Sequence, residues 1–444
     1  MAEAYIVGAV RTPVGKRNGG LSGVNPVDMA AHVLNELVRR TGVDAAAVDD
    51  VVMGCVSQVG PQTLDIARQS WLSAGLSEQV PGVTIDRQCG SSQQAVHFAA
   101  QGVMSGTQDL VIAAGVESMS MVPMGSSVAL PMNMALPFGE GWKQRYGDQE
   151  ISQFRGAQLM CEKWGITRDQ LEDYALESHA RAVRAIDDGR FASQITELAG
   201  VSTDEGPRRD TSKEKMAGLQ PIREGWEITR DQLEEFALSS HARAVHAIDE
   251  GYFTSQITEL AGVSVDEGPR RDPVKMKEKM ATLEPLRPGW ELTAATASQI
   301  SDGSAALLIA SEEAVHRHNL TPRARIHALA VTGADPVFML TGPIPATGQA
   351  LSRAKLEIDE IDVFEVNEAF APVLIAWSAD TGASLARTNP NGGAIALGHP
   401  LGATGAILMT KLVHELERTG GRYGLQTMCE GGGQANATII ERVA

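Results

Sequence analysis

Short apolar runs alternate with longer stretches of mixed polarity through the first 120 residues of the chain. Each run has the length of a buried strand, and the stretches 63–74 and 90–105 are typical of helices. Strands that alternate with helices in this way predict a mostly parallel sheet with helices on its faces. The predicted strands are Ala4–Val10, Val51–Val56, Val83–Asp86 and Leu110–Ala114.

The helix after the first strand is marked at both ends. Asn25 and Pro26 are the residue types expected at an N-cap and at the first helical position, where a missing N–H costs nothing. Gly42 is the residue type that ends helices in a left-handed turn. The sequence therefore predicts a helix between Asn25 and Gly42.

The same alternation returns from about residue 322 onward. We therefore predict an α/β fold with two similar halves, each with a mixed sheet between helices, and an inserted domain between them. The first half comprises residues 1–120 with about 300–321, the inserted domain 121–299, and the second half 322–444. In the second half the predicted strands are Arg323–Val331, Val363–Val366, Leu425–Cys429 and Ala435–Glu441, and the predicted helices are Glu368–Ala379 and Gly402–Arg418.

The inserted domain contains a tandem repeat. Residues 166–210 and 228–272 align with a shift of 62, and eight of the 45 aligned positions differ. With the similarity that follows, the two copies extend over 166–227 and 228–291. Two copies are too few for a solenoid, so the repeat indicates a local duplication. Each copy predicts a helix of about 20 residues, a short strand and a charged turn.

Composition narrows the class of protein. A formal charge of −17 argues against nucleic acid as a main partner. No apolar run is long enough for a membrane span, and the N-terminus lacks the basic leader of a signal peptide. None of the four cysteines stands in a CxxC pair, which argues against zinc and against a local redox motif. Free thiols suit a reducing compartment, so we predict a cytoplasmic protein.

Cys89 stands where α/β folds build their sites. It follows the predicted strand Val83–Asp86 and precedes a Gly- and Ser-rich helix start. The positive end of a helix favours the thiolate, which is the reactive form of cysteine, so we expect a nucleophile here. A buried helix-start cysteine is the alternative. Cys55 and Cys161 have no such context and are interpreted as buried apolar residues.

Three further residues stand in glycine-rich or strand-end positions. His399 lies in a loop of Gly, Asn and Pro residues, where it can move a proton or donate to a thioester oxygen. Cys429 ends a predicted strand before three glycines, and it can carry a proton. Asn367 follows Val363–Val366 and can hold a water or orient backbone. The alternatives are a turn-capping histidine, a strand-end cysteine and a helix-capping asparagine.

Two nucleotide-binding patterns are absent. The segment GAVRTPVGKR (8–17) has the wrong spacing for a phosphate-binding loop. The spacing of Gly398, Gly402 and Gly405 does not match a dinucleotide-binding motif, and no acidic residue at the right distance supports one.

The chain resembles the thiolase family. DRQCGSSQQA (86–95) resembles the family's nucleophile motif, NEAFA (367–371) its asparagine motif, GGAIALGHPLGATG (392–405) its histidine motif and CEGGGQA (429–435) its second-cysteine motif. RTPVGK (11–16) and TAATASQISDGSAA (293–306) also resemble family segments. The similarity covers the whole chain apart from one copy of the repeat, and it implies a thiolase-like fold.

The resemblance implies a role for each motif. Cys89 would become acylated, and His399 would activate it and bind the thioester oxygen with a water held by Asn367. Cys429 would be the second acid/base. The backbone amides of Cys89 and Gly431 would form the other oxyanion hole.

The resemblance also implies how coenzyme A is held. Ser298 matches a serine near the CoA thioester, and Phe370 would line the acyl pocket. The family's phosphate-binding arginine matches DEGPR, which occurs in both copies, at Arg208 and at Arg270. We favour Arg270 slightly, because a short tether connects it to Ser298. The segment SQFRGAQL (152–159) departs from the His-Met segment of short-chain biosynthetic members.

These implications lead to a predicted function. We predict a degradative 3-ketoacyl-CoA thiolase, an acyl-CoA:acetyl-CoA C-acyltransferase of β-oxidation and lipid metabolism. Its substrates would be acyl-CoA and CoA, with no prosthetic group and no metal, and it would form a homodimer or homotetramer. The alternatives are a biosynthetic thiolase that condenses two acetyl-CoA and an inactive thiolase-like protein that binds acyl-CoA.

Overall fold

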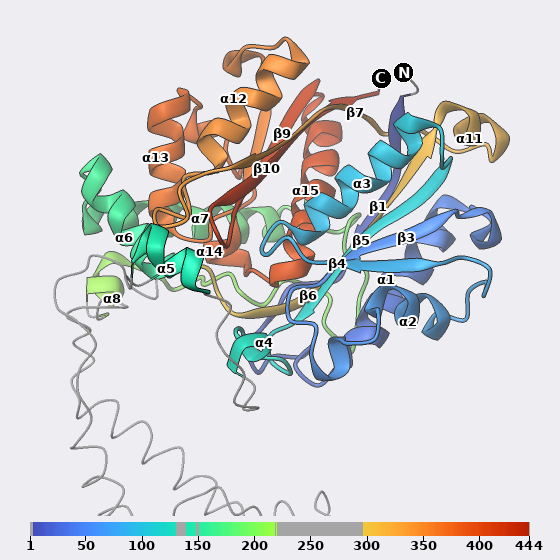
Figure 1. Ribbon diagram of the computed structural model, residues 1–444, viewed down its shortest axis with the longest axis horizontal. Coiled ribbons are helices and arrows are strands. Elements are labelled where there is room, and N and C mark those ends of the chain that lie inside the picture. The colour runs from blue at the N-terminus through green and yellow to red at the C-terminus, as the bar shows by residue number, and fades with distance from the viewer. Residues whose placement is uncertain (1–2, 130–138, 148–150, 218, 220–295, 444) are drawn as a thin grey trace, which may run out of the picture. The chain divides into compact units, whose positions relative to one another are not determined.

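A computed structural model describes residues 3–129, 139–147, 151–217, 219 and 296–443 (Figure 1). The chain divides into two units, Met1–Met216 with Ala295–Ala444, and Ala217–Ala294. The fold and the site below belong to the first unit. The second copy of the repeat, with His241 and Arg270, lies outside the described residues.

Two separate stretches of the chain form the first half of the fold. One extends from β1 to β5, and the other consists of β6 and α11. β1 carries a run of buried residues, and α1 begins and ends as predicted. Asn25 accepts from the Val27 N–H, and Gly42 adopts the left-handed conformation with φ +69°. The elements of this half are β1 (Ala4–Arg11), β2 (Gly15–Lys16), α1 (Pro26–Thr41), β3 (Asp50–Gly54), α2 (Ile66–Ser73), β4 (Gly82–Ile85), α3 (Ser91–Ser105), β5 (Leu110–Ser118), β6 (Ser301–Ser311) and α11 (Glu312–Arg317).

The second half contains four strands and the helices between them. Its longest helix, α15, is buried along most of its length. The elements are β7 (Ala324–Gly333), α12 (Pro343–Ala354), β8 (Val363–Val366), α13 (Ala371–Thr381), α14 (Ala394–Leu397), α15 (Thr404–Thr419), β9 (Tyr423–Glu430) and β10 (Gln434–Arg442).

The strands of both halves join into one mixed sheet of ten strands in the described part of the chain. The order is β4-β3-β5-β6-β1-β7-β10-β9-β8, with β2 paired to β6. The β3–β4, β3–β5 and β8–β9 pairs are parallel, and the others are antiparallel. The halves meet at β1 and β7, which pair through only Tyr5 with Arg325 and Ile6 with Ala324.

Strand order and direction relate the two halves. β3, β5, β6 and β1 correspond to β8, β9, β10 and β7. The position after β3, which is Cys55, then corresponds to Asn367 after β8. The counterpart of β4 is a single parallel bridge between Phe364 and Thr388. The segments that lead to Cys89 and His399 therefore leave matching places in the two halves.

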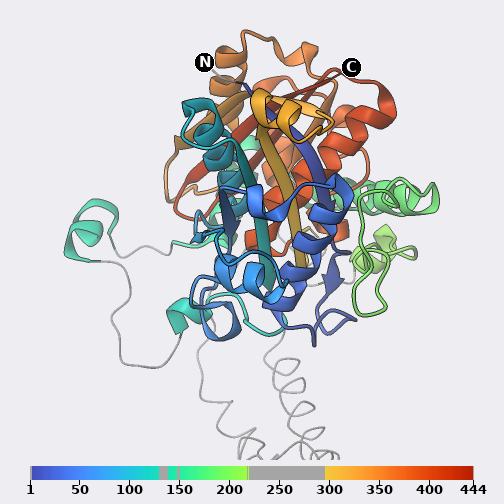
Figure 2. The same ribbon diagram turned by 90° about the vertical axis from the view of Figure 1, so that its right-hand side faces the viewer.

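Helices form layers on both sides of the strands (Figures 1 and 2). α1 and α2 cover one face of the first half, and α12 packs on β7, β9 and β10. α3 and α15 lie between the halves and contact each other. Strand residues alternate between the two cores: Leu110, Ile112 and Ala114 face α1 and α2, whereas Val111 and Ala113 face α3 and α15. This is the period of two expected of a strand that is buried on both faces.

The starts of α3 and α15 approach each other backbone to backbone. A Cβ added to Gly405 would fall 2.2 Å from the Gln93 backbone nitrogen, and one added to Gly54 would fall 2.3 Å from that of Ser92. The Ala406 N–H also donates to Ser92 Oγ at 2.9 Å. Only glycine permits this approach, which brings the ends of β3 and β4 to the histidine loop.

The first copy of the repeat packs on both halves. Its predicted 20-residue helix is α7 (Arg168–Asp187), with a Thr167 capping box. Isolated bridges at Ile195, Leu198 and Val201 replace the short strand that the sequence predicts, because this segment pairs only briefly with Arg11 and with itself. The other short helices of this region are α4 (Ser126–Ala129), α5 (Glu140–Tyr146), α6 (Gln153–Trp164) and α8 (Lys213–Ala217).

A buried ion pair fixes this copy to the first strand. Both side chains are fully buried, and Arg11 donates to the two Asp204 oxygens at 2.6 and 2.8 Å. Arg11 Nε also donates to Gln194 at 2.8 Å, and its guanidinium lies over the Phe191 ring. The Val14 N–H donates to Asp204 as well. This network satisfies a charge that would otherwise be costly to bury.

We expect Asp204→Ala to destabilise the protein by about 3–5 kcal/mol, because Arg11 would remain buried without its carboxylate. Asp187→Ala is the matched control, since Asp187 pairs with Arg209 on the surface and little change is expected. Urea unfolding midpoints of both variants measure the difference. Equal midpoints for the two variants would contradict this account.

Candidate active site

The four chemistry-bearing residues lie at strand ends or in the loop beside them. Cys89 follows β4 and Asn367 follows β8. Cys429 is the second-last residue of β9, and His399 lies between α14 and α15. In open α/β sheets the carboxyl ends of parallel strands form the usual site. The structure therefore places the residues of four separate motifs at one end of the sheet.

Cys89 is the most accessible cysteine of the chain. It is half-buried, whereas Cys55, Cys161 and Cys429 are buried. Gln88 before it has φ +50°, and the Gly90 N–H donates back to the Arg87 carbonyl in a tight turn. The positive φ of Gln88 is an uncommon conformation for a non-glycine residue, and such residues cluster at functional sites.

The expectation that the helix start favours a Cys89 thiolate is wrong. Burial, followed by the carboxyl of Glu430, raises the pKa of Cys89 to about 12, and the N–H of Cys89 itself offsets only part of this effect. The loss of hydration outweighs the helix end because α3 begins two residues later. The thiol is therefore protonated at neutral pH.

His399 is held in one tautomer by Thr404. Thr404 Oγ1 donates its single proton to the Pro400 carbonyl at 2.9 Å, so it must accept from His399 Nδ1 at 2.7 Å. Burial lowers the pKa of His399 to about 4, so the ring is neutral at neutral pH. The Nε2 lone pair is therefore available to accept a proton.

Asn367 faces this lone pair. Its Nδ2 lies 3.4 Å from His399 Nε2, and both side chains are buried. The Asn367 backbone N–H donates to the Thr427 carbonyl of β9. Its Oδ1 is buried without a hydrogen-bond partner in the described part of the chain. Asn367 and His399 therefore direct an N–H and a ring nitrogen toward the same space.

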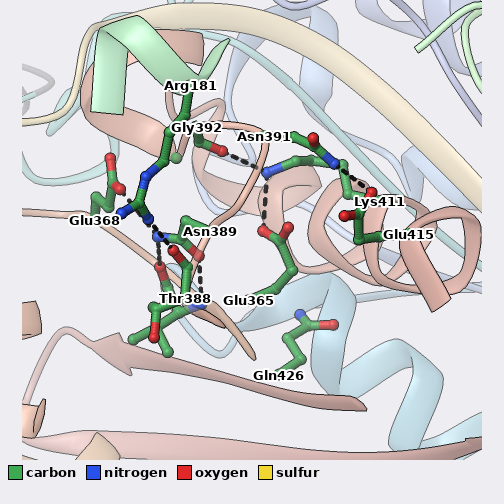
Figure 3. Close-up of polar contacts among 12 residues, drawn as sticks. Arg181, Glu365, Glu368, Thr388, Asn389, Asn391, Gly392, Lys411, Glu415 and Gln426 are labelled. Atoms are coloured by element: carbon green, nitrogen blue, oxygen red, sulfur yellow. Dashed lines mark hydrogen bonds and ion pairs between the residues drawn. The ribbon is translucent and has the colours of Figure 1, made fainter. Parts of the chain in front are cut away.

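Glu368, which was not among the functional residues predicted from the sequence motifs, fixes the loop behind Asn367. It accepts from Tyr174 Oη at 2.8 Å, Ser178 Oγ at 2.7 Å, Asn389 Nδ2 at 2.9 Å and the Ile395 N–H at 3.0 Å. Tyr174 and Ser178 belong to α7 of the first repeat copy. One carboxylate thus joins the repeat, the asparagine motif and the start of the histidine motif, and Figure 3 shows Glu368 with Asn389.

A second buried pair supports the same loop. Lys411 of α15 donates to Glu365 at 2.8 Å and to the Gly392 carbonyl at 2.7 Å, and both charged side chains are fully buried (Figure 3). Asn391 donates to Glu415 at 2.8 Å. The loop that ends in His399 is therefore held at fixed points by α15 and β8.

Cys429 and Gly431 lie beside the Cys89 loop. Burial, followed by the nearby Cys89, raises the pKa of Cys429 well above its ordinary value. A Cβ added to Gly431 would fall 2.9 Å from Gln88 Oε1, so the glycine turn after β9 touches the residue before Cys89. The two cysteines are thus neighbours, both protonated at neutral pH.

The segment with Ser298 lies beside the asparagine motif. The Ser298 N–H donates to the Ala369 carbonyl at 3.0 Å, and Ala297 bridges to Phe370. Phe370 is buried and packs edge to face on Phe154 of α6, with ring centroids 5.5 Å apart. This aromatic pair joins α6 to the asparagine motif.

Gln299 joins the first repeat copy to the histidine loop. Its Nε2 donates to the carbonyls of Gly206 at 3.1 Å and of Ile395 at 2.9 Å, and its own carbonyl accepts from the His399 N–H at 3.1 Å. Arg208, two residues after Gly206, is exposed, and its backbone N–H donates to His179. His179 is buried, and burial lowers its pKa to about 4.

The described residues contain neither a membrane-spanning helix nor a metal-binding cluster. Among them, no helix is long and apolar enough to cross a membrane. In the same ranges no group of three His, Cys, Asp or Glu side chains is arranged to hold a metal ion.

Comparison with known proteins gives consistent matches. The family model for the thiolase N-terminal domain matches residues 4–225 and again 222–313, so each stretch contains one repeat copy. The model for the thiolase C-terminal domain matches residues 320–442.

Individual relatives agree with these family models. The chain is 51% identical to a steroid 3-ketoacyl-CoA thiolase of Mycobacterium tuberculosis, over all of this chain and 95% of that protein. It is 37% identical to a β-ketoadipyl-CoA thiolase of Escherichia coli over the full length of both. The crystal structure of human mitochondrial 3-ketoacyl-CoA thiolase in complex with CoA matches with a TM-score of 0.78 and 30% identity, over 100% of this chain and 98% of that one.

These matches confirm the predicted α/β thiolase fold and the predicted enzyme class. With family models over both halves, a full-length relative at 51% identity and the thiolase architecture, the chain belongs to the thiolase family of acyltransferases.

Proposed function

We propose that this thiolase cleaves a 3-ketoacyl-CoA with CoA through an acyl-enzyme on Cys89. The observation that carries the proposal is the neutral His399, whose tautomer leaves the Nε2 lone pair as an acceptor that faces Asn367 Nδ2. Cys89 is the accessible thiol of the same site. A protonated thiol beside a neutral base is a pair in which the base can take the proton as the thiol attacks.

Both groups are neutral at rest because burial disfavours their charged forms. Burial raises the pKa of Cys89 and lowers the pKa of His399, so a thiolate–imidazolium pair is unfavourable before attack. The proton therefore moves to His399 Nε2 as Cys89 Sγ attacks the keto carbon. The carbon–carbon bond then breaks, and acetyl-CoA leaves as an enolate that takes a proton from Cys429.

The second half-reaction reverses these roles. Cys429 takes the proton of an incoming CoA thiol, and the CoA sulfur attacks the acyl group on Cys89. The Cys89 sulfur then leaves and takes back the proton that His399 accepted in the first half-reaction. Asn367 Nδ2, with His399, would stabilise the enolate oxygen, and the amides of Cys89 and Gly431 would stabilise the tetrahedral intermediates. No step requires a redox change, since each transfers only an acyl group and protons.

We propose that Arg208 and Ser298 hold CoA. Gln299 ties the segment of Arg208 to that of Ser298, which supports Arg208 as the arginine for a CoA phosphate. Arg208 is exposed and so accessible to a phosphate. Arg270 stays a prediction, because it lies outside the described residues.

The acyl group is proposed to be bulky and ring-bearing. The relative at 51% identity is a steroid 3-ketoacyl-CoA thiolase, and this chain lacks the His-Met segment of short-chain members. Phe154 and Phe370 supply apolar surface beside the site. Flat rings pack well on such aromatic faces.

We also propose a cytoplasmic homodimer or homotetramer. β4 is an edge strand of the sheet, and Val83 on it is 43% exposed. Phe98 of the neighbouring helix α3 is also 43% exposed. Exposed apolar residues at a sheet edge favour pairing with another chain.

We expect acetyl-CoA release from a ring-bearing 3-ketoacyl-CoA to have a kcat/KM about 10-fold or more above that for acetoacetyl-CoA, since several buried methylene groups separate the two substrates.

Without CoA, mass spectrometry should find the acyl group on Cys89. Cys89→Ser should lower turnover on the order of 10⁴-fold, whereas Cys161→Ser is the control. Faster acetyl-CoA condensation would favour the biosynthetic alternative, and binding without turnover or adduct would favour an inactive binding protein.

We expect Thr404→Val to lower kcat about 10-fold, because His399 Nδ1 would lose its acceptor and the ring could take the unproductive tautomer. Thr404→Ser keeps the hydroxyl and should restore most of the activity. Steady-state kinetics with both variants test this, with KM for CoA as the companion readout. Equal losses of kcat in the two variants would indicate a packing effect instead.

We expect Arg208→Ala to raise the KM for CoA about 10-fold through loss of a charge-assisted hydrogen bond. Arg209→Ala is the control, since Arg209 already pairs with Asp187. With a pantetheine thiol that lacks the nucleotide phosphates, the Arg208→Ala effect should disappear. An unchanged KM for CoA would move the phosphate contact away from Arg208.

A further inference from the structure

Glu430 is a fully buried carboxyl beside the Cys89 loop. It is the last residue of β9, and a Cβ added to Gly90 would fall 2.0 Å from Glu430 Oε1. Within the described residues neither of its carboxyl oxygens accepts a hydrogen bond of ordinary geometry, and the Asn436 backbone N–H is the donor that lies near them. A buried carboxylate so poorly supplied with donors is costly, and this favours its protonated form.

Asn436 presents a second acceptor to the same point. Its Oδ1 lies 2.7 Å from the Cβ position on Gly90, and this oxygen also has no partner among the described residues. Asn436 Nδ2 donates to the Gly90 carbonyl at 3.4 Å, so Asn436 and Glu430 both lie against Gly90. Two acceptor oxygens that face one point repel each other unless a proton lies between them.

Arg87, in the segment before α3, is the charged group that acts on Glu430. Glu430 in turn acts on the two thiols, Cys89 and Cys429, and Asp86 and Glu117 of β5 act on Cys89 as well. Arg87 opposes the effect of burial, but burial prevails and raises the pKa of Glu430 to about 8.

The remaining neighbours add no charge. Burial lowers the pKa of His97 on α3 to about 3, so its ring is neutral, and it bonds to Thr438. The side chains that β10 presents here are Gln434, Asn436 and Thr438, all without charge.

We propose that Glu430 carries a proton in the resting enzyme and donates it to Asn436 Oδ1, which ties the Cys89 loop to the β9–β10 hairpin. Glu430 is a positioning residue, because it acts through Gly90 and not on the substrate. The proposal rests on Cys89 as the nucleophile of the proposed function. When Glu430 is ionised its charge adds to the raised pKa of Cys89, and its protonation at rest removes this charge from beside the thiol.

Loss of this proton should change the reactivity of Cys89. An ionised Glu430 would stand beside Cys89 and Cys429 and would stabilise their protonated forms. Below its pKa a thiol becomes about tenfold more reactive for each pH unit, since only the thiolate reacts. The rise should flatten above pH 8, where Glu430 ionises and the Cys89 pKa moves upward.

The test is the alkylation rate of Cys89 by iodoacetamide from pH 6 to 10, followed by mass spectrometry of the Cys89 peptide. Glu430→Gln keeps the shape and a donor for Asn436 but cannot ionise. We expect it to match the unmodified protein at pH 6.5 and to react about 10-fold faster at pH 9.5, as one neighbouring charge predicts. Glu313→Gln, on the exposed surface of α11, is the matched control and should follow the unmodified protein throughout.

Two outcomes would overturn the proposal. A faster Glu430→Gln protein already at pH 6.5 would mean that Glu430 is ionised at rest, and equal rates at every pH would mean that it does not act on Cys89. If the variant does not fold, the unmodified protein still tests the proposal. An alkylation rate of Cys89 that rises through pH 8 without flattening would contradict it.

A second variant tests the shared proton. Asn436→Asp places two carboxyls at the same point, so the flattening should move to higher pH, and no movement would refute sharing. Alkylation reports the Cys89 pKa whether or not the enzyme turns over. A missing acyl adduct would therefore reject the proposed function without affecting this result.

Discussion

The backbone contact between the starts of α3 and α15 is the constraint on which the site depends. Gly405 lets these two segments approach, and Gly54 at the end of β3 packs as closely on the start of α3, at distances that no side chain would allow. Because each helix follows the strand ends of its own half, the contact brings the two sets of strand ends together. Cys89 comes from one half, and Asn367, His399 and Cys429 come from the other. A methyl group at this contact would separate the nucleophile from its base without touching either.

The sequence allowed most of the framework to be predicted. Caps at Asn25 and Gly42 marked α1, and apolar runs marked most strands, because these signals are local. β6 has no alternating pattern, since Ser301–Ser311 is buried on both faces and rich in small residues. The motifs identified the chemistry-bearing side chains for the same reason, as each carries its own glycine-rich surroundings.

What sequence could not supply was the environment of those side chains. Thr404 fixes His399 through a proton that is already committed to Pro400. Gln299 and Glu368 act by joining segments that lie many residues apart, which no local pattern encodes. The expected Cys89 thiolate was wrong for the same reason. Burial and a carboxyl from the far end of the chain outweigh the nearby helix start.

The differences between the repeat copies fall partly on docking residues. Tyr174, which donates to Glu368, is Phe236 in the second copy, so that copy has no hydroxyl for this bond. Asp204 is retained as Asp266. The pattern fits the first copy as the one adapted to this core.

The pairing of the N-terminal strand with distant partners explains how the chain tolerates a duplication. β1 pairs with β6 and β7, and β5 pairs with β6, so the connection between β5 and β6 is long in any thiolase of this architecture. The entropy of closing a loop grows only with the logarithm of its length, so 62 added residues raise the closure free energy by about 0.4 kcal/mol. Natural selection against such an insertion would act on folding time and on access to the site far more than on the stability of the sheet.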